Sequence, residues 1–277
     1  MVKISIQGAR GSFHDIVARA RFPGESEIIE SPTYQQVFED VKKGQAQYGV
    51  VAIENSSYGS FLDNYDLLLK YESWIVAEVY LHVVYNLIAF PGVNIKDITE
   101  VYSHPTAMAE SHLFLEQHPQ IKRIETDDTA GSVRMIKEKE LRHATAVAPK
   151  LTAELYGMHV LSRDIGTNKK NYMRFLIIAR DGVKPEGDAN KTSLVIRAKN
   201  IPGSLYLCLK CFADEGINLT KIESRPIIGD VWQYHFYLDF ERGLAAPETQ
   251  RALKELSKVA SKARILGSYE KGQMLES

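Results

Sequence analysis

The stretch Val51-Ala52-Ile53-Glu54-Asn55-Ser56-Ser57-Tyr58-Gly59-Ser60 decides how the rest of the chain is interpreted. An apolar run from Tyr48 to Ile53 ends here in small polar side chains, and apolar runs of this length bounded by turn residues indicate buried strands. In open α/β sheets, ligands bind just beyond the carboxyl ends of the strands. The polar cluster, Glu54 to Ser57, therefore lies where a polar ligand would bind. The alternative is an ordinary turn in which Ser and Asn cap the next helix.

Around this stretch, the chain alternates between strand-like and helix-like patterns as far as residue 180. The expected strands are Lys3–Gln7, Glu27–Glu30, Tyr48–Ile53, the long apolar Ile75–Ala89, one ending at Val101, Lys122–Glu125, Ala144–Ala148, His159–Leu161 and Arg174–Ala179. The expected helices are Ser12–Arg21, Thr33–Lys43, Tyr58–Lys70, one from Pro105 to about His118, one from Asp127 to Lys139 and one through Tyr156. Such alternation predicts a parallel sheet with helices on both faces. The long central segment and the late return strand favour two lobes with a cleft between them.

The composition changes between Asp181 and Lys191, where glycine, proline and charged residues replace the apolar pattern. This is typical of a linker, so we expect a first domain at residues 1–181, a linker at 182–191 and a second domain at 192–277. The second domain is expected to contain strand Ser193–Ala198, helix Gly203–Asp214, strands Leu219–Ser224 and Val231–Asp239, helix Pro247–Val259 and strand Ala263–Ser268. This βαββαβ order predicts a ferredoxin-like α+β fold.

Composition and charge restrict the class of protein. The chain has 277 residues, of which 44% are hydrophobic and 25% charged, which is ordinary for a globular protein of two domains. Its net charge of −1 gives no basic field for nucleic acid or for an anionic membrane. No apolar run reaches the length of about 18 residues that a spanning helix needs, and the chain opens directly into a strand-like segment. We therefore expect a cytoplasmic protein.

The two cysteines of the chain, Cys208 and Cys211, form a C-x-x-C pair. Such a pair can bind zinc or act as a redox centre. A zinc site needs two further ligands, and the nearest candidate, His235, has no partner at metal-binding spacing. A redox pair should open a helix that follows a strand, whereas these residues lie inside the apolar stretch Leu205–Phe212. We therefore expect buried structural cysteines and no metal site.

Three loops concentrate reactive groups, and the first two precede expected helices. Gly8–His14 contains two glycines that let the backbone approach a ligand, and Ser12 begins the helix behind it. This suits an anion, because helix N-termini present free N–H groups, but the spacing excludes nucleotide-binding loops. Ser103-His104-Pro105 follows a strand and places Pro105 at a favoured first helical position, the alternative being a plain serine cap.

The third loop, Asn171–Phe175, precedes the return strand and supplies one cation, Arg174. An arginine here could bind a carboxylate through two parallel hydrogen bonds. The alternative is a salt bridge across the sheet. Because the loops leave strand ends or flank the return strand, we expect their side chains to meet a substrate in one cleft.

Taken together, these segments resemble the prephenate dehydratase family over nearly the whole chain. The family pattern Gly-Pro-x-Gly-Thr-Phe-Ser resembles Gly8 to His14, and Ile-Glu-Asn-Ser-x-x-Gly-Ser is matched by Ile53 to Ser60. Further similarities are Ser103 to Met108 with Ser-His-Pro-x-Ala-Leu, Asp128 to Gly131 with Asp-Thr-Ala-Gly, and Ala148 to Met158 with Ala-x-x-Tyr-Gly-Leu. In the second domain, Gly203-Ser204-Leu205 and the stretch from Gly216 to Pro226 are similar to the family's ACT regulatory domain and its phenylalanine-responsive motif.

The resemblance implies a two-lobed catalytic domain like the periplasmic binding proteins, followed by an ACT domain. It implies the conversion of prephenate into phenylpyruvate, carbon dioxide and water in L-phenylalanine biosynthesis, with allosteric feedback by L-phenylalanine. No metal or organic cofactor is implied. The implied partners are prephenate, L-phenylalanine as effector, and further copies of the chain in a homodimer or homotetramer.

The loops and the resemblance together nominate three sets of site residues. The expected catalytic residues are Asn55, Ser103, His104, Glu110 and Arg174. The expected substrate-binding residues are Ser12, Glu54, Ser56, Asn171 and Met173. The effector is expected between paired ACT domains, at Pro202, Gly203, Ser204, Leu205, Asn218, Leu219, Glu223, Ser224 and Arg225. Here the glycine lets the backbone approach an amino acid closely; the alternative for Glu223–Pro226 is a capped turn with a surface ion pair.

The first loop departs from the family pattern at Ala9, Ser12 and His14, and two further departures bear directly on the chemistry. Met173 stands where the family has the threonine expected to bind or protonate the leaving hydroxyl, and a thioether has no proton to donate. Glu110 stands where the family has glutamine, and we expect it to take over the donor role, because a dry apolar cleft raises the pKa of a carboxyl. The alternative is a solvated helix residue. Met173 also favours a second interpretation, a catalytically weakened paralogue that acts as a phenylalanine-binding regulatory protein.

Overall fold

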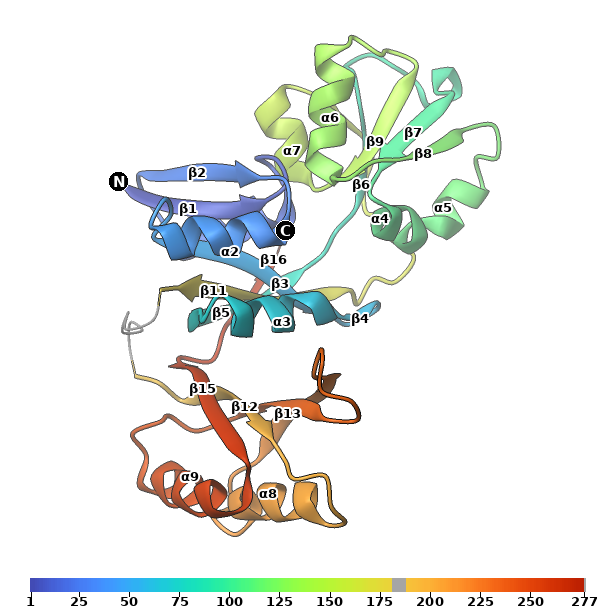
Figure 1. Cartoon of the computed structure of the whole chain (residues 1–277). Coiled ribbons are helices and arrows are strands. Elements are labelled where there is room, and N and C mark those ends of the chain that lie inside the picture. The colour runs from blue at the N-terminus through green and yellow to red at the C-terminus, as the bar shows by residue number, and fades with distance from the viewer. Residues whose placement is uncertain (181–187, 277) are drawn as a thin grey trace. The chain divides into compact units, whose positions relative to one another are not determined.

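The computed structural model describes residues 1–180 and 188–276, which form two compact units (Figure 1). Unit 1 comprises Met1–Leu67, Val79–Leu176 and the segment from Gln273 onward, and unit 2 comprises Leu68–Glu78 and Ile177–Gly272. Most of the predicted linker at 182–191 lies on residues 181–187, outside the described part of the chain. Within the described part, no helix has the length and apolar character that crossing a membrane requires.

Unit 1 begins with three parallel strands in the order β2-β1-β3. The elements here are β1 (Val2–Gln7), α1 (Phe13–Arg21), β2 (Ser26–Ser31), α2 (Tyr34–Lys43) and β3 (Tyr48–Asn55). Ile4 sets the register, because it lies opposite Ile28 on one side and Tyr48 on the other. Thr33 caps α2 by accepting the backbone N–H of Gln36 at 3.2 Å. The parallel pairing expected from the alternating pattern is therefore found in this part of the unit.

The polar stretch after β3 forms a tight hairpin before the next helix begins. The helix was predicted from Tyr58, but α3 spans Leu62–Lys70 and follows β4 (Gly59–Ser60), which pairs antiparallel with the end of β3. The reason is Asn55, whose Oδ1 accepts the backbone N–H groups of Ser57 and Tyr58 at 2.8 Å each. Such local side-chain bonds compete with helix formation and close a turn instead.

The apolar run predicted as one strand, Ile75–Ala89, is divided into β5 (Trp74–His82) and β6 (Asn86–Ala89). Between them, the backbone N–H of Val83 donates to the carbonyl of Asn171 at 2.8 Å, just before the return strand β11 (Tyr172–Ala179). The chain leaves the first sheet at this point, and β6 joins a different one. Hydrophobicity alone could not show this change of sheet, because both strands are buried.

The second part of unit 1 is a five-stranded sheet in the order β10-β6-β9-β7-β8. Besides β6, its elements are η1 (Ile95–Asp97), β7 (Glu100–Ser103), α4 (Pro105–Glu110), α5 (His112–Glu116), β8 (Lys122–Glu125), α6 (Thr129–Glu138), β9 (Ala144–Ala148), α7 (Lys150–Tyr156) and β10 (His159–Ser162). β7 is parallel to β8 and β9, whereas β6 is antiparallel to β9 and β10. The predicted parallel sheet is therefore found here only for β7, β8 and β9, whereas the pairings of β6 are antiparallel. Helical crossovers join β7, β8 and β9, as parallel neighbours require, whereas the chain enters and leaves this sheet through β6 and β10.

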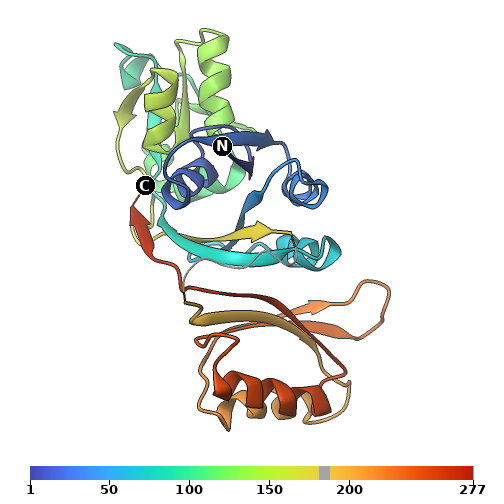
Figure 2. The same ribbon diagram turned by 90° about the vertical axis from the view of Figure 1, so that its left-hand side faces the viewer.

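Unit 2 contains an antiparallel sheet in the order β13-β14-β12-β15, with α8 and α9 on one face (Figure 2). The elements are β12 (Lys191–Arg197), α8 (Ser204–Ala213), β13 (Leu219–Pro226), β14 (Tyr234–Phe240), α9 (Pro247–Val259) and β15 (Lys262–Tyr269), in the predicted order. Leu194, Ile196 and Leu238 pack with the two helices in one core. Cys208 and Cys211 are free thiols buried on α8, where the apolar pattern placed them.

A short final strand, β16 (Met274–Glu276), was not predicted. It belongs to unit 1 and pairs parallel with β5, so that Met274 lies opposite Tyr80 and Glu276 lies opposite His82. Three residues are too few to show a periodic pattern, and the strand is defined by its partner rather than by its own sequence.

Candidate active site

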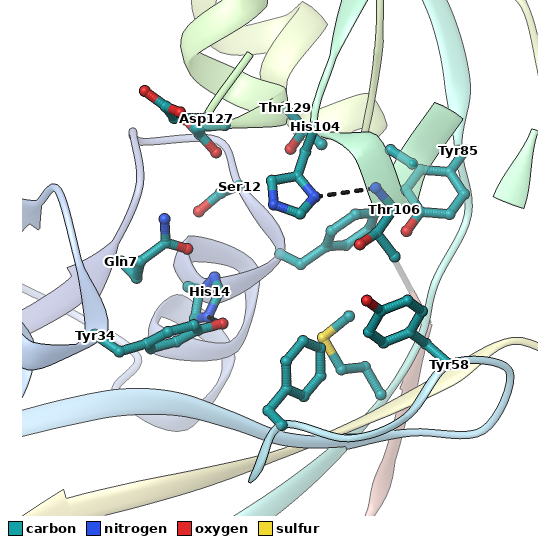
Figure 3. A pocket seen from close by; sticks show the side chains of 15 residues that line it. Gln7, Ser12, His14, Tyr34, Tyr58, Tyr85, His104, Thr106, Asp127 and Thr129 are labelled. Atoms are coloured by element: carbon teal, nitrogen blue, oxygen red, sulfur yellow. Dashed lines mark hydrogen bonds between the residues drawn. The ribbon is translucent and has the colours of Figure 1, made fainter. Parts of the chain in front are cut away.

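Unit 1 contains a cavity of about 310 Å³ at which several of the predicted loops meet (Figure 3). It lies at the carboxyl end of β1, beside the beginnings of α1, α4, α6 and β11. This volume is at the lower end of the range for small-molecule sites and suits a ligand with one ring. The lining residues are Gln7, Ser12, Phe13, His14, Tyr34, Tyr58, Phe61, Tyr85, His104, Thr106, Ala107, Asp127, Asp128, Thr129 and Met173.

The loop after β1 reaches the cavity because glycine permits a close approach. Gly8 and Gly11 have φ angles of 86° and 88°, in the region that favours glycine. A Cβ atom on Gly8 would lie 2.7 Å from Oδ1 of Asp128. The other oxygen of Asp128 accepts the backbone N–H groups of Ala9 at 2.9 Å and Gly131 at 2.6 Å. One carboxyl group thus fastens the glycine loop to the start of α6.

The carboxyl group of Asp128 also determines the charge at this side of the cavity. Burial raises the pKa of Asp128, and the backbone N–H groups of Ala9 and Gly131 oppose that shift because they stabilise the charged form. Asp127 lines the cavity beside it. This end of the cavity therefore presents hydrogen-bond acceptors.

The buried His14 and the half-buried Tyr34 form a hydrogen-bonded pair in the wall. Nε2 of His14 lies 3.0 Å from the Tyr34 hydroxyl, and the His14 ring meets Phe175 edge-on with 5.0 Å between ring centroids. Burial lowers the pKa of His14 to about 3, so the imidazole is neutral at neutral pH. Burial, reinforced by the charge of Asp128, raises the pKa of Tyr34. Both side chains are therefore neutral hydrogen-bonding groups.

His104, a predicted catalytic residue, points into the cavity (Figure 3). Its Nδ1 accepts the backbone N–H of Thr106 at 3.2 Å at the start of α4, so the proton of the neutral ring resides on Nε2. Burial lowers the pKa of His104, and the charges of Asp128, Asp127 and Glu125 oppose this shift. A neutral imidazole with a defined tautomer is thus available to a ligand.

Ser12 and Met173 also line the cavity, whereas Ser103 does not. Ser12 caps α1 by accepting the backbone N–H of Asp15 at 3.4 Å. Met173 is 8% exposed and places its thioether in the wall. Ser103 is fully buried, and its hydroxyl donates to the carbonyl of Val147 at 2.7 Å. The Ser103 side chain therefore fixes β7 against β9 instead of meeting a ligand.

Asn55, Asn171 and Glu110 form one chain of hydrogen-bonded side chains, although none of them lines the cavity. Nδ2 of Asn55 donates to Oδ1 of Asn171 at 2.8 Å, and Nδ2 of Asn171 donates to Oε2 of Glu110 at 3.3 Å. Burial raises the pKa of Glu110, and the nearby His112 opposes the shift. The carboxyl group of Glu110 therefore supports an amide, and it has no direct contact with the cavity in this structure.

The helix that carries Glu110 ends at this residue. The sequence pattern predicted one helix from Pro105 to about His118, but the structure has α4 and α5 separated at Ser111. The backbone N–H of Thr167 donates to the carbonyl of Glu110 at 2.6 Å, and Oγ1 of Thr167 accepts the N–H of Leu113 at 3.3 Å. Insertion of Thr167 into the hydrogen-bond ladder breaks the helix.

Arg174, Glu54 and Ser56 lie where β3 and β11 adjoin, and they do not line the cavity. Arg174 is 6% exposed, and its Nη1 is 3.8 Å from Oε2 of Glu54, which is the cross-sheet ion pair considered as its alternative role. Oγ of Ser56 accepts the N–H of Tyr172 at 2.8 Å and donates to the carbonyl of Lys170 at 3.2 Å. These contacts tie the turn after β3 to the segment before β11.

Most of the aromatic lining was not predicted as part of the site. Asp128 and Thr129 could have been predicted as site residues, because they belong to the Asp-Thr-Ala-Gly segment, in which Asp128 caps a helix. No feature of the sequence marks Tyr34 or Tyr85 as a site residue, since each lies in or beside an ordinary helix or strand pattern. Only the folded structure places them at the cavity. A single sequence shows which loops are reactive, but it does not show which aromatic residues surround them.

Unit 2 contains a second cavity, of about 390 Å³, beside the start of α8. Three predicted effector residues, Gly203, Ser204 and Leu205, line it. Pro202 is their neighbour in the chain, while the remaining predicted residues, Asn218, Leu219, Glu223, Ser224 and Arg225, lie at or on β13 and do not line the cavity. The structure thus divides the predicted effector set between a cavity and an adjacent strand.

The arrangement in unit 1 is that of an enzyme or binding protein for a small polar ligand, built from two α/β sheets and joined in the chain to an α+β unit. Among the described residues, no group of three or more His, Cys, Asp or Glu side chains is arranged to hold a metal ion. Residues 4–183 match the family described as prephenate dehydratase. This chain belongs to the prephenate dehydratase family, as its sequence motifs predicted.

Two of three similar proteins carry the name of this family, and the third is described differently. The chloroplastic arogenate dehydratase/prephenate dehydratase 2 of Arabidopsis thaliana is 38% identical over 278 residues, which cover 97% of this chain and 72% of the relative. A solved prephenate dehydratase of Arthrobacter aurescens in complex with L-Phe is similar with a TM-score of 0.87 and 30% identity, covering 98% of this chain and 90% of that chain. GqqA, described as a novel type of quorum quenching acylase, is similar with a TM-score of 0.88 and 32% identity, covering 98% of each chain.

Proposed function

We propose that the protein converts prephenate into phenylpyruvate in the cavity of unit 1. The observation that carries this proposal is the family match over residues 4–183, which includes every residue that lines the cavity. In the reaction, the bond from the ring to its carboxylate breaks and its electrons enter the ring. The bond to the ring hydroxyl then breaks, and this group leaves as water after taking a proton. The ring becomes aromatic, so the protein needs only to bind, orient and supply the proton.

The proton donor that best fits the geometry is His104. It lines the cavity, its Nδ1 is occupied by Thr106, and the proton on Nε2 is free to face the leaving hydroxyl. Burial keeps the pKa of His104 below its ordinary value in this structure. A bound dianionic substrate would raise that pKa, because an opposite charge favours the protonated form, and protonation at Nδ1 would break the bond from the Thr106 N–H. Substrate binding would thus create the acid that the reaction consumes.

The substrate carboxylates need cationic or N–H partners. Arg174 is the predicted partner, and in this structure it forms an ion pair with Glu54 at 3.8 Å. Although Arg174 does not line the cavity in this structure, we assign it to the side-chain carboxylate of the substrate, which would replace Glu54 as its partner. Asn171 and Asn55 hold the segment from which Arg174 extends. Ser56 holds the same segment through its two bonds to the backbone.

For the second unit, we propose an ACT domain of the ferredoxin-like fold that binds L-phenylalanine. The βαββαβ order of its elements and the cavity at Gly203–Leu205 support this assignment. The relative from Arthrobacter aurescens is described as a complex with L-Phe. In this proposal, residues 1–181 are the catalytic domain and residues 192–277 the regulatory domain, and the effector changes activity by favouring one packing of the protein over another.

The surface around the second cavity fits a second copy of the chain. Ile201, Tyr206 and Trp232 are 60%, 65% and 74% exposed, and all three line the cavity. Large apolar side chains gathered on one exposed face are typical of an interaction surface. We therefore propose a homodimer, or a tetramer built from it, in which L-phenylalanine lies between paired ACT domains.

Met173 favours one alternative function. It lines the cavity where the family pattern has threonine, so the site lacks a hydroxyl at that point. The alternative is a catalytically weakened relative whose function is to bind phenylalanine and regulate a partner. It retains the same unit 2 and the same effector.

Purified protein with prephenate decides between the two functions. Formation of phenylpyruvate, followed by its ultraviolet absorbance, is the expected result. The same assay with arogenate, followed by release of phenylalanine, measures the preference between the two substrates. Phenylalanine binding by calorimetry without turnover of either substrate would support the regulatory alternative and exclude the enzyme.

A further inference from the structure

His82, at the end of β5, makes two side-chain hydrogen bonds to acceptors. Its Nδ1 lies 2.7 Å from Oε2 of Glu276 on β16, and its Nε2 lies 2.8 Å from the backbone carbonyl oxygen of Lys169. A carboxylate and a carbonyl oxygen both accept hydrogen bonds and have no proton to give. An imidazole can donate from both nitrogens only in its doubly protonated, cationic form. Both nitrogens of His82 can therefore donate in this arrangement only if the ring is an imidazolium ion.

The groups that face His82 from each neighbouring element agree with this charge. Glu276 faces it from β16, and the Tyr172 ring from β11 lies over it with 5.0 Å between centroids. The segment before β11 contributes Lys169 and Asp164, which pair with each other at 3.1 Å. The hydrogen bond to Glu276, then that to the Lys169 carbonyl, raises the pKa of His82, and the charge of Asp164 adds to the rise while partial burial opposes it.

The carbonyl that His82 binds belongs to the segment that carries Asn171. Two residues beyond Lys169, Asn171 joins Asn55 and Glu110 through its side chain and accepts the N–H of Val83 through its carbonyl. Because Val83 follows His82 directly, the end of β5 holds this segment at two points. One is a backbone bond that does not titrate, and the other is the imidazolium, which does.

We propose that His82 is a positioning residue of the enzyme, which in its protonated form fastens β16 and the Asn171 segment together, so that substrate affinity falls when His82 loses its proton. This inference rests on the proposed function of unit 1. A neutral His82 can donate from only one nitrogen, so its other nitrogen presents a lone pair to Glu276 or to the Lys169 carbonyl. One of the two bonds is then lost, and either β16 or the segment before Asn171 is released. Arg174 lies three residues beyond Asn171 and would lose its alignment with the substrate.

The test is a series of KM and kcat measurements for prephenate between about pH 6 and 9, the range around the ordinary pKa of histidine. For the unmutated protein, we expect KM to rise about two- to fivefold with pH, since a partly exposed charged hydrogen bond is worth a factor of this size. The dependence of kcat on pH, which His104 sets, should be the same in the His82 variants. His82→Gln should show the higher KM at every pH. His82→Arg, which stays charged, should remove the rise.

Two further variants separate this role from general damage. Glu276→Gln removes the charge that favours the imidazolium and leaves an exposed position otherwise intact, so the rise in KM should move to lower pH. His159→Gln makes the same substitution at an exposed histidine of β10 and should follow the unmutated protein. A KM profile that both His82→Gln and Glu276→Gln leave unchanged would overturn the proposal.

A measurement that needs no turnover completes the test. ¹⁵N NMR of the histidine side chains should show both nitrogens of His82 protonated at pH 7 and a loss of one proton at higher pH. A singly protonated His82 at pH 7 would overturn the proposal even if the enzyme is active. Absence of turnover in the unmutated protein would instead refute the proposed function, and the NMR result would still decide the state of His82.

Discussion

Asn55 and Asn171, which are 116 residues apart in the chain, are joined by a 2.8 Å hydrogen bond from Nδ2 of Asn55 to Oδ1 of Asn171. The other hydrogen bonds of Asn55 determine the direction of this bond. Oδ1 of Asn55 already accepts the N–H groups of Ser57 and Tyr58, so its Nδ2 must face Asn171. Nδ2 of Asn171 is consequently turned toward Glu110. The turn after β3 thereby determines how the segment before β11 is oriented.

Removing one partner of this bond should destabilise the protein. In Asn171→Ala, the buried Nδ2 of Asn55 loses its acceptor, and an unsatisfied buried donor costs about 1–3 kcal/mol. Thermal unfolding should show the loss. Asn168→Ala is the control, because Asn168 is exposed and its bond to Oγ of Ser57 can be replaced by water. Equal destabilisation by the two substitutions would contradict a special role for the Asn55–Asn171 bond.

Arg174 should determine substrate affinity if it binds a carboxylate. Losing a charge-assisted pair with two parallel bonds costs about 2–4 kcal/mol, so Arg174→Ala should raise KM by roughly a hundredfold. Lysine cannot form the two parallel bonds, so Arg174→Lys should recover only part of the affinity. Arg163→Ala, at an exposed arginine of the same unit, is the control. An unchanged KM in Arg174→Ala would remove this residue from the site and leave it as the partner of Glu54.

His14 should make stability depend on pH. Burial lowers its folded pKa from 6.5 to about 3, so on acidification the unfolded chain takes up a proton before the folded protein does. The contribution to stability is therefore full above pH 6.5 and is lost as the pH falls from 6.5 toward 3. The slope approaches about 1.4 kcal/mol per pH unit. His14→Gln cannot titrate, and its unfolding curves at pH 7 and pH 5 should differ by less than those of the unmutated protein.

The sequence predicted the elements better than it predicted how they pair. The parallel β1–β3 pairing follows from buried apolar runs separated by helices, which is a local pattern. The change of sheet between β5 and β6 was missed, because it depends on Asn171, which meets Val83 only in the folded chain. β16 was missed for the same reason, since three residues acquire a strand conformation only beside β5.

The residues of the site show the same limit of prediction from local sequence patterns. His104, Ser12 and Met173 line the cavity, and each stands at or beside the start of a helix or strand that the motifs marked. Ser103 is one residue from His104, yet it points into the protein and binds a carbonyl. Which of two adjacent polar residues faces a ligand depends on the direction of the strand. A motif places the loop, but it does not orient each side chain.

Phenylalanine binding should depend on the glycine at the start of α8. Gly203 has a φ of 78° and lines the cavity of unit 2, so Gly203→Ala adds a methyl group beside the proposed ligand and strains the backbone. Gly216→Ala is a matched control, because Gly216 also has positive φ, at 64°, with open space around it, but does not line the cavity. Calorimetry should show weaker binding in the first variant alone. Equal loss of affinity in both would mean that strain, not contact, is responsible.

The last prediction concerns the proton donor. The sequence favoured Glu110, but its carboxyl group binds Asn171 and does not line the cavity, whereas Met173 and His104 do. Glutamine at position 110 still offers an oxygen to Asn171. Glu110→Gln should therefore leave the rate, and the fall in rate at high pH, nearly unchanged. Met173→Thr adds a hydroxyl in the cavity wall and should raise kcat by about tenfold or more, toward the range of general acid catalysis.

Two control variants test whether the gain in kcat comes from the hydroxyl and whether His104 is the donor. Met173→Val has the shape of threonine without the hydroxyl, so a rise in kcat with Thr but not with Val assigns the gain to the hydroxyl and not to the space created. His104→Gln, which has no ring proton to donate, should abolish most of the rate whether residue 173 is Met or Thr. If Glu110→Gln strongly lowers the rate and removes the fall in rate at high pH, then Glu110 is the donor after all. Its raised pKa would then be the reason that it holds a proton near neutral pH.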